Sequence, residues 1–416
     1  SYSVTGVQTC ALPIWEGEPL LKAAPPEAMH LLREDALRTF MQAGIPDRKN
    51  ENYKYTSLTP FLSADYHFVP AGNAGSFELT EAFKCDIPRL DTILLLVVNG
   101  WFHSVSLQGN QLPEGVLIGS LAEMACKHPE LVNSRYGQLA TPGGDPMADL
   151  NTAWARDGYF IYVPRGVKLE KPVQVINILE SDRETFVTQR NLVIAEPEAE
   201  LKLVVCDHTL NLNRYFANTV TEVFTGRNGS VDLCAVQNQH NLTAAVHAVY
   251  HHLERDAHLT THAVTLHGGM VRNNLKVILD GENAEANMYG MAFLDRRQHV
   301  DNFLQVVHAS PHCLSNQHYK NVLDDAASGA FSGRIHVVRD AQKTNAYQRN
   351  NSLLLTDKAL MQAKPQLIIE ADDVKCSHGA TVGQIDENAL FYLRSRGIEE
   401  SQARLMLMNE IGRAHV

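Results

Sequence analysis

Residues 158–383 repeat one pattern: a short run rich in aliphatic and β-branched residues, followed by a polar turn. Alternating apolar and polar positions within a run are typical of strands that bury one face. The turns are rich in Asp, Asn, Glu and Gly, which break strands and favour tight backbone bends. The clearest turns lie at residues 196–200, 227–230, 255–258, 280–284 and 324–328.

The early turns are roughly thirty residues apart, a spacing close to two coils of a parallel β-solenoid. One coil buries only the faces that meet its neighbours, so several coils are needed for stability. A sandwich or a barrel is the alternative, but two-residue hairpin signals such as Asn228-Gly229 are few. The pattern therefore predicts a mainly β protein whose core, residues 146–385, is a right-handed parallel β-helix.

Helical spacing replaces this pattern at both ends of the chain. Apolar residues recur every three or four positions in residues 20–43, and Gly44 ends this helix ahead of a proline. After the β-rich region, Asp386 is a good N-cap and Gly397 a good residue to follow the last turn. We expect a mixed α/β N-terminal domain over residues 15–145 and the start of a C-terminal helical domain over residues 386–410.

The two extreme segments, residues 1–14 and 411–416, are expected to be foreign to the fold. One short DNA segment, read on opposite strands, can encode both residues 9–14 and residues 411–416. Such a coincidence is typical of a sequencing adapter carried into a gene sequence. We therefore expect both segments to lack packed contacts, Cys10 to have no function, and the C-terminal helical domain to be truncated.

Composition narrows the function classes. The 416 residues suffice for one to three domains with a large core. A net charge of −11 without a basic face argues against a nucleic-acid binder. The longest apolar run, residues 93–98, is too short to span a membrane. The cysteines other than Cys10 are scattered without CxxC spacing, which argues against disulfides and four-cysteine clusters and favours a reducing cytoplasm.

Cys376 and His378 are the candidate metal ligands. A predicted strand leads into a polar loop, residues 372–379, that presents both side chains. They are two residues apart, so an extended backbone would place them on the same face. A thiolate and an imidazole both bind iron or zinc, although one pair supplies only two ligands. Lys375 next to Cys376 is expected to favour the thiolate. The alternative is a structural thiol beside a surface histidine.

Other histidines are expected to be structural. Seven histidines lie close together in one β-rich region. They form no HExxH pattern, and we expect them to face outward from strands. They are His240, His247, His251, His252, His258, His262 and His267. His308, His312 and Cys313 are expected in a loop, with a contribution of metal ligands as the alternative. The chain also has no P-loop, nucleophile-elbow or kinase signature, so it is not expected to bind nucleotide by such a motif or to be an enzyme.

The sequence around the candidate ligands resembles that of a known family. Residues 364–398, with Lys-Cys-Ser-His-Gly-Ala-Thr-Val-Gly at 375–383, resemble the SufD proteins of the SufB/SufD family of iron–sulfur cluster assembly. Residues 44–56 resemble the family's N-terminal signature, with Tyr53 where a tryptophan is expected. Residues 149–153 and 158–167 are similar to the entry into its central domain. The resemblance extends from about Trp15 to about Glu410.

The resemblance implies a non-catalytic scaffold in a SufB–SufC–SufD complex. The chain would pair with a SufB-like subunit through the β-helices and bind a SufC-like ABC ATPase through its C-terminal helices. A transient iron–sulfur cluster would form at the shared interface, with His378 as ligand or transfer residue and Cys376 beside it. Two alternatives stay open. One is a SufB-like homodimer, and the other is a β-helix carbohydrate-active enzyme that would use Asp256, Asp280 and Glu282.

Overall fold

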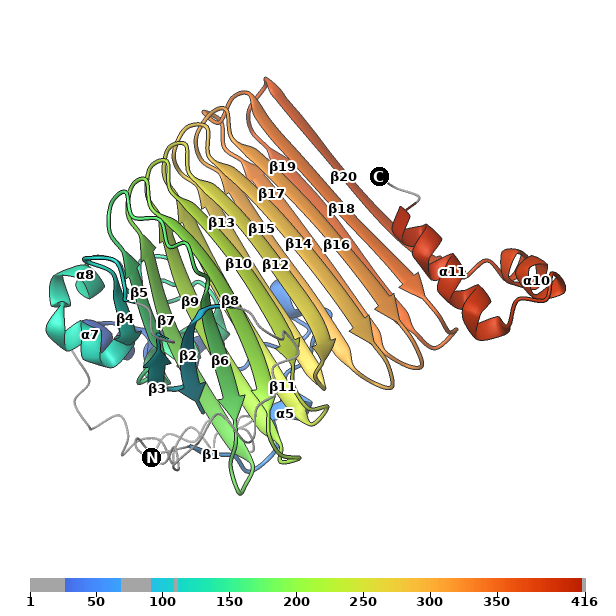
Figure 1. The fold of residues 1–416 in the computed structure, drawn as a ribbon, viewed down its shortest axis with the longest axis horizontal. Coiled ribbons are helices and arrows are strands. Elements are labelled where there is room, and N and C mark those ends of the chain that lie inside the picture. The colour runs from blue at the N-terminus through green and yellow to red at the C-terminus, as the bar shows by residue number, and fades with distance from the viewer. Residues whose placement is uncertain (1–26, 69–90, 108–110, 414–416) are drawn as a thin grey trace.

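Two ten-stranded sheets face each other in the computed structural model, which describes residues 27–68, 91–107 and 111–413 (Figure 1). The first sheet has the order β19 (Leu360–Ile369), β17 (Ser328–Val337), β15 (His299–His308), β13 (Met270–Leu279), β11 (Thr243–Leu253), β9 (Tyr215–Thr225), β7 (Thr185–Ala195), β5 (Tyr159–Val163) and β4 (Leu117–Ser120), with β1 (His67–Phe68) beside β7. The second sheet has the order β20 (Val374–Gln384), β18 (Thr344–Leu354), β16 (Leu314–Leu323), β14 (Glu285–Leu294), β12 (His258–His267), β10 (Ser230–Asn238), β8 (Glu200–Thr209), β6 (Val173–Leu179), β2 (Ile93–Val98) and β3 (Trp101–Ser106).

From β5 onward the chain alternates between the two sheets and builds a parallel β-solenoid of about 8 turns, which confirms the predicted fold class. The predicted coil length was wrong. Asn273 of β13 pairs with Asn302 of β15, which is 29 residues later and one coil further on. Thirty residues therefore make one coil rather than two, because each coil contains two strands of about ten residues as well as two turns.

The predicted polar turns form the corners between the sheets. Each of the five turn segments contains one non-glycine residue with φ between 50° and 65°, a conformation that Asn and Asp adopt most readily. These residues are Glu198, Asn228, Asp256, Asn283 and Asp325. Successive corners also bond to each other, as when the Asn228 amide donates to the Arg255 carbonyl at 3.0 Å. Asn228-Gly229 is therefore a corner of the solenoid and not a hairpin.

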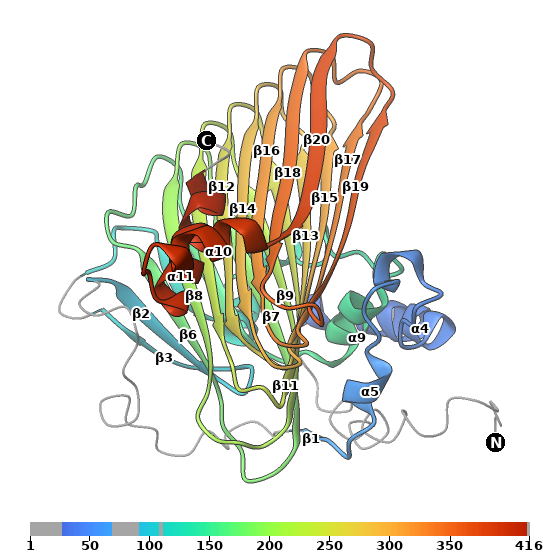
Figure 2. The same ribbon diagram turned by 90° about the vertical axis from the view of Figure 1, so that its right-hand side faces the viewer.

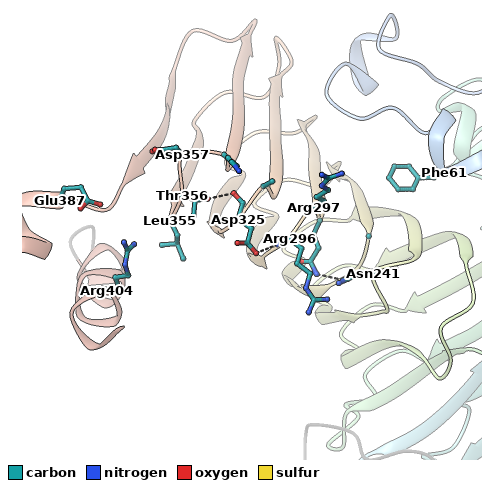
Figure 3. Close-up of a pocket in the computed structure, with 14 residues that line it drawn as sticks. Phe61, Asn241, Arg296, Arg297, Asp325, Leu355, Thr356, Asp357, Glu387 and Arg404 are labelled. Carbon is teal, nitrogen blue, oxygen red and sulfur yellow. Dashed lines mark hydrogen bonds between the residues drawn. The ribbon is translucent and has the colours of Figure 1, made fainter. Parts of the chain in front are cut away.

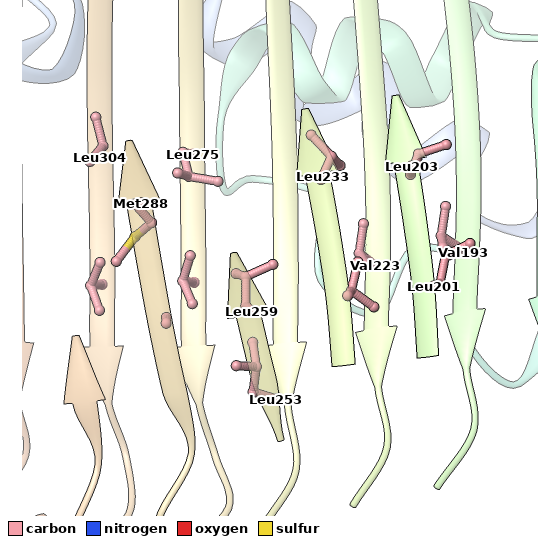
Figure 4. Packing of buried hydrophobic residues seen from close by; sticks show 14 of the residues in the cluster. Val193, Leu201, Leu203, Val223, Leu233, Leu253, Leu259, Leu275, Met288 and Leu304 are labelled. Atoms are coloured by element: carbon pink, nitrogen blue, oxygen red, sulfur yellow. The ribbon is translucent and has the colours of Figure 1, made fainter. Parts of the chain in front are cut away.

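The main core lies between the two sheets. Alternate side chains of each strand point inward, so Val193 and Val223 of the first sheet face Leu201, Leu203 and Leu233 of the second (Figure 4). All five are buried. Burial of each such side chain contributes about 1.5–3 kcal/mol, so stacking of coils provides the driving force that a single coil lacks.

The N-terminal region covers the outer face of the first sheet (Figure 2). Its helices are α3 (Glu27–Leu31), α4 (Arg33–Ala43), the 3-10 helix η1 (Glu51–Tyr53), α5 (Thr59–Leu62), α7 (Leu121–Lys127), α8 (Pro129–Asn133) and α9 (Pro146–Trp154). α9 packs on β7 and β9, and α4 packs on α9. α4 ends at Gly44 with φ 69°, as predicted, whereas residues 20–26 of that predicted helix lie outside the described residues.

Two helices follow the last strand: α10 (Glu387–Ser395) and α11 (Glu400–Arg413). Asp386 caps α10 by accepting the amides of Asn388 and Ala389, and Gly397 follows its end at φ 86°, which confirms the predicted caps. Leu390 and Ala403 pack on Leu353 of β18. Residues 411–413 belong to α11, whereas 1–14 and 414–416 lie outside the described residues, so the expected absence of packing there stays a prediction. Within the described ranges, no helix has the length and apolarity needed to span a membrane.

Candidate functional site

The candidate ligands lie at the open end of the solenoid. β19 and β20 are the last strands of their sheets, so neither has a neighbour on its outer edge among the described residues. The predicted loop over residues 372–379 was wrong, because Val374–Gln384 form a strand. Parallel pairing with β18, which aligns Cys376 with Ala346 and His378 with Gln348, keeps this polar and glycine-containing segment extended.

Cys376 and His378 lie on the same side of β20, as their spacing predicts. Their partners in register, Ala346 and Gln348, are buried side chains that point into the solenoid. Cys376 is half-buried and packs against the main core. His378 is exposed, because no further coil covers it in the part of the chain that the structure describes. The two side chains therefore face the uncovered interior of the last coil.

The predicted thiolate is not supported by the structure. Burial raises the pKa of the Cys376 thiol, against a smaller opposing contribution from the Ala346 backbone. Lys375 is exposed and, as the adjacent residue in a strand, points to the opposite face. The expectation that Lys375 favours the thiolate was therefore wrong. Residues that are adjacent in a strand point to opposite faces of the sheet, so the ammonium group of Lys375 is directed away from the Cys376 thiol.

The sequence analysis did not predict a column of amide side chains that lies beneath His378. Gln348 is buried next to His378 in register, and its Nε2 donates to Oε1 of Gln317 at 2.7 Å in the coil below. Gln317, Gln348 and His378 are each about one coil apart in the sequence. A correct coil length would therefore have aligned these three residues. Polar amide side chains therefore lie directly beneath His378 at the open end.

Metal binding at this end stays a prediction. Within the described residues, no group of three or more His, Cys, Asp or Glu side chains is arranged to hold a metal ion. Cys376 and His378 can supply at most two ligands, whereas tetrahedral sites need four. Any cluster bound here would require ligands from a second chain.

Two histidine predictions were wrong: His251 does not face outward, and His308 is the last residue of β15 and not part of a loop. His251 is completely buried between Val223 and Val277 in the main core, and burial lowers its pKa to about 3. His308 is also buried, and its pKa is lowered to about 4 by burial. His312 and Cys313 do lie in the corner between β15 and β16, as predicted, and the Cys313 side chain packs in the main core. His251 of β11 and His308 of β15 face inward because they fall at inward positions of the two-residue alternation, which their polarity obscures in the sequence.

Replacing His251 with leucine should weaken the dependence of stability on pH. An unfolded histidine binds a proton near pH 6.5, whereas folded His251 binds it only near pH 3, so acidification between these values favours unfolding. From pH 6.5 to pH 5 this group alone removes about 2 kcal/mol from the free energy of unfolding. His251→Leu should recover that loss in urea titrations, and His252→Gln should not. Identical pH slopes for His251→Leu and the unchanged protein would contradict this assignment.

A cleft with a volume of about 1070 Å³ is lined by residues other than Cys376 and His378. Figure 3 shows its lining side chains. Solenoid corners form one wall, where the Thr356 hydroxyl donates to the Asp325 carbonyl at 2.6 Å. Arg404 of α11 and Phe61 of α5 lie on other sides. Charges of both signs are mixed along this cleft, so it shows no preference for one class of ligand.

The carboxylates invoked for a carbohydrate-active enzyme lie in the corners. Asp280 contacts His252 at 3.0 Å, and Arg255 lies 3.3 Å from Asp256 and 3.9 Å from Glu282. Each carboxylate thus pairs with a neighbouring cation or imidazole. This arrangement is that of ion pairs between stacked turns, and it gives no support to the enzyme alternative.

Comparisons with known proteins agree with this fold. Residues 177–411 match the family model described as SUF system FeS cluster assembly, SufBD core domain, and residues 15–175 match the SufBD protein N-terminal region. The iron–sulfur cluster assembly protein SufD of Escherichia coli is 30% identical over 93% of this chain and 87% of its own length. SufD of Bacillus subtilis is 28% identical over 88% of this chain and 84% of its own. SufB of the same organism is 24% identical over 80% and 72%.

Proposed function

The chain belongs to the SufBD family of the SUF iron–sulfur cluster assembly system, and from this membership we propose that it is a non-catalytic scaffold subunit of SufD type. The observation that carries the proposal is the position of Cys376 and His378. Both face the uncovered interior of the terminal coil, where side chains of a second chain could reach them. The nascent cluster is cargo at this site, to be released after assembly.

The open end of the solenoid suits pairing with a second chain. β19 and β20 present edges of ten and eleven residues, and unpaired strand edges are templates for strand addition. We propose a SufB-like subunit as the partner, since the relatives of this chain include proteins of both names. A second copy of this chain is the alternative. Ligands from both chains would then complete a site that opens when the chains move apart.

The C-terminal helices support docking of a SufC-like ABC ATPase. Phe391 and Tyr392 of α10 are 72% and 57% exposed, and Leu405 of α11 is 58% exposed. Large apolar side chains at such exposure are typical of a protein interface. The ATPase would supply the nucleotide chemistry, and this chain would bind no nucleotide. We propose the reducing cytoplasm as the compartment, which its cysteine usage favours.

Co-expression with candidate partners tests the proposal. The tagged chain is produced with a SufB-like subunit and a SufC-like ATPase, and the purified complex is examined for subunit ratio and, under anaerobic conditions, for iron content and cluster absorbance. We expect both partners to co-purify, with loss of the ATPase alone in Phe391→Ser/Leu405→Ser. Recovery of the chain as a monomer with neither partner would contradict the proposal.

A further inference from the structure

The interior of the solenoid contains a polar chamber several coils away from β20. The chamber is a cavity of about 70 Å³, bounded by inward side chains of both sheets. Its amides bond to one another, as when Gln237 Nε2 donates to Asn273 Oδ1 at 2.6 Å and Asn191 Nδ2 to Thr221 Oγ1 at 2.9 Å. A cavity needs only about 10–15 Å³ to hold a water molecule, so this chamber has room for a small ligand.

One carboxylate and one imidazole meet in this chamber without bonding to each other. Asp207 comes from β8 and His247 from β11, and their side chains are only 6% and 12% exposed. Asp207 Oδ2 lies 3.7 Å from His247 Nε2, beyond the usual hydrogen-bond range of about 2.7–3.2 Å. Asn177 donates to the other carboxylate oxygen at 2.7 Å. His247 Nε2 is buried and has no hydrogen-bond partner in the described part of the chain.

We propose that this chamber binds one divalent first-row transition-metal ion through Asp207 Oδ2 and His247 Nε2. Imidazole nitrogen and carboxylate oxygen bond such ions at about 2.0–2.2 Å, so two atoms 3.7 Å apart can share one ion at an angle of about 120°. A direct ion pair would bring the two groups closer together. A shared ion explains both the gap and the unpartnered nitrogen.

The other chamber walls determine the class of ion. Thr221, Gln237 and Asn273 also line the cavity, and their side-chain oxygens accept hydrogen bonds from Asn191, Thr265 and Gln237, so water would fill the remaining positions of the ion. Magnesium and calcium prefer oxygen alone, whereas an imidazole ligand favours iron, zinc or cobalt. The site needs no side chain of the open end, so it is separate from Cys376 and His378 and does not depend on the proposed scaffold function.

Binding of Co²⁺ to the whole purified chain tests the proposal. Equilibrium dialysis and visible absorption should show one tightly bound equivalent. Asp207→Asn and His247→Gln should each weaken this binding at least tenfold, because each removes one of two strong ligands. His252→Gln is the matched control, since His252 forms a direct pair with Asp280 at 3.0 Å on the surface, and it should leave the binding unchanged.

Three outcomes would overturn the proposal. One is Co²⁺ binding by Asp207→Asn and His247→Gln as tight as that of the unchanged chain. Another is loss of binding in His378→Ala alone, which would locate the ion at the open end. If the chamber variants fail to fold, X-ray absorption of the Co²⁺-loaded unchanged chain decides, since the chamber predicts nitrogen and oxygen ligands without sulfur at about 2.3 Å. A failure to find SUF partners would leave all of these results unaffected.

Discussion

Replacing Glu222 with alanine should lower the free energy of unfolding by about 3–5 kcal/mol, because it leaves Arg190 as an unpaired buried charge. Both side chains are completely buried, with Glu222 Oε2 2.6 Å from Arg190 Nη2. The same carboxylate accepts the backbone amides of Gly137 and Leu139, each at 2.8 Å, and of Ala140 at 3.1 Å. One substitution therefore removes the partners of four donors at the junction of the N-terminal region and β9.

Urea titration of Glu222→Ala against the unchanged chain measures this loss. Hydrogen exchange should show the earliest opening at residues 137–140 and in α9, because Arg190 also donates to Thr152 at 2.8 Å. The matched control is Glu282→Ala. Glu282 lies 3.9 Å from Arg255 in an exposed pair, so its removal should cost less than about 1 kcal/mol. Equal losses in the two variants would show that the buried pair does not anchor the N-terminal region.

Local chemistry made the corners and caps predictable. Asn228 and Asp256 occur where the backbone needs a positive φ, and Asp386 and Gly397 bound a helix through their own conformational preferences. Such signals need no knowledge of distant residues. The fold class followed from them, because corners that recur at a regular spacing leave few architectures other than a solenoid.

Pairing between coils was not predictable in the same way. The Arg190–Glu222 pair joins neighbouring strands, 32 residues apart, and a coil length of half the true value hides that neighbourhood. Asp207 was missed for a related reason: it continues the inward series Leu201, Leu203 and Val205, but a carboxylate at an inward position reads as a surface residue. Residues 374–379 were assigned to a loop because their strand is specified by pairing with β18 and not by its own composition.

Replacing His378 with alanine should abolish cluster assembly in the purified complex while the two chains still associate. His378 is an exposed side chain of the terminal strand, and no hydrogen bond or ion pair holds it among the described residues, so its removal disturbs no packing. The alanine variant keeps the β20 backbone, which would form the edge for a partner strand. Cys376→Ala should reduce the cluster yield less, because burial disfavours the thiolate of Cys376.

Iron content and cluster absorbance of the co-purified complex measure this effect, with the amount of partner chain as the reference. His336→Ala is the matched control. His336 lies on β17, near the same end of the solenoid, and contacts Glu370 at 3.0 Å on the outer face, so its loss should not change the cluster yield. A normal yield from His378→Ala would eliminate the ligand role. Loss of the partner chain in that variant would instead show that His378 contributes to the interface between the subunits and not to the chemistry of the cluster.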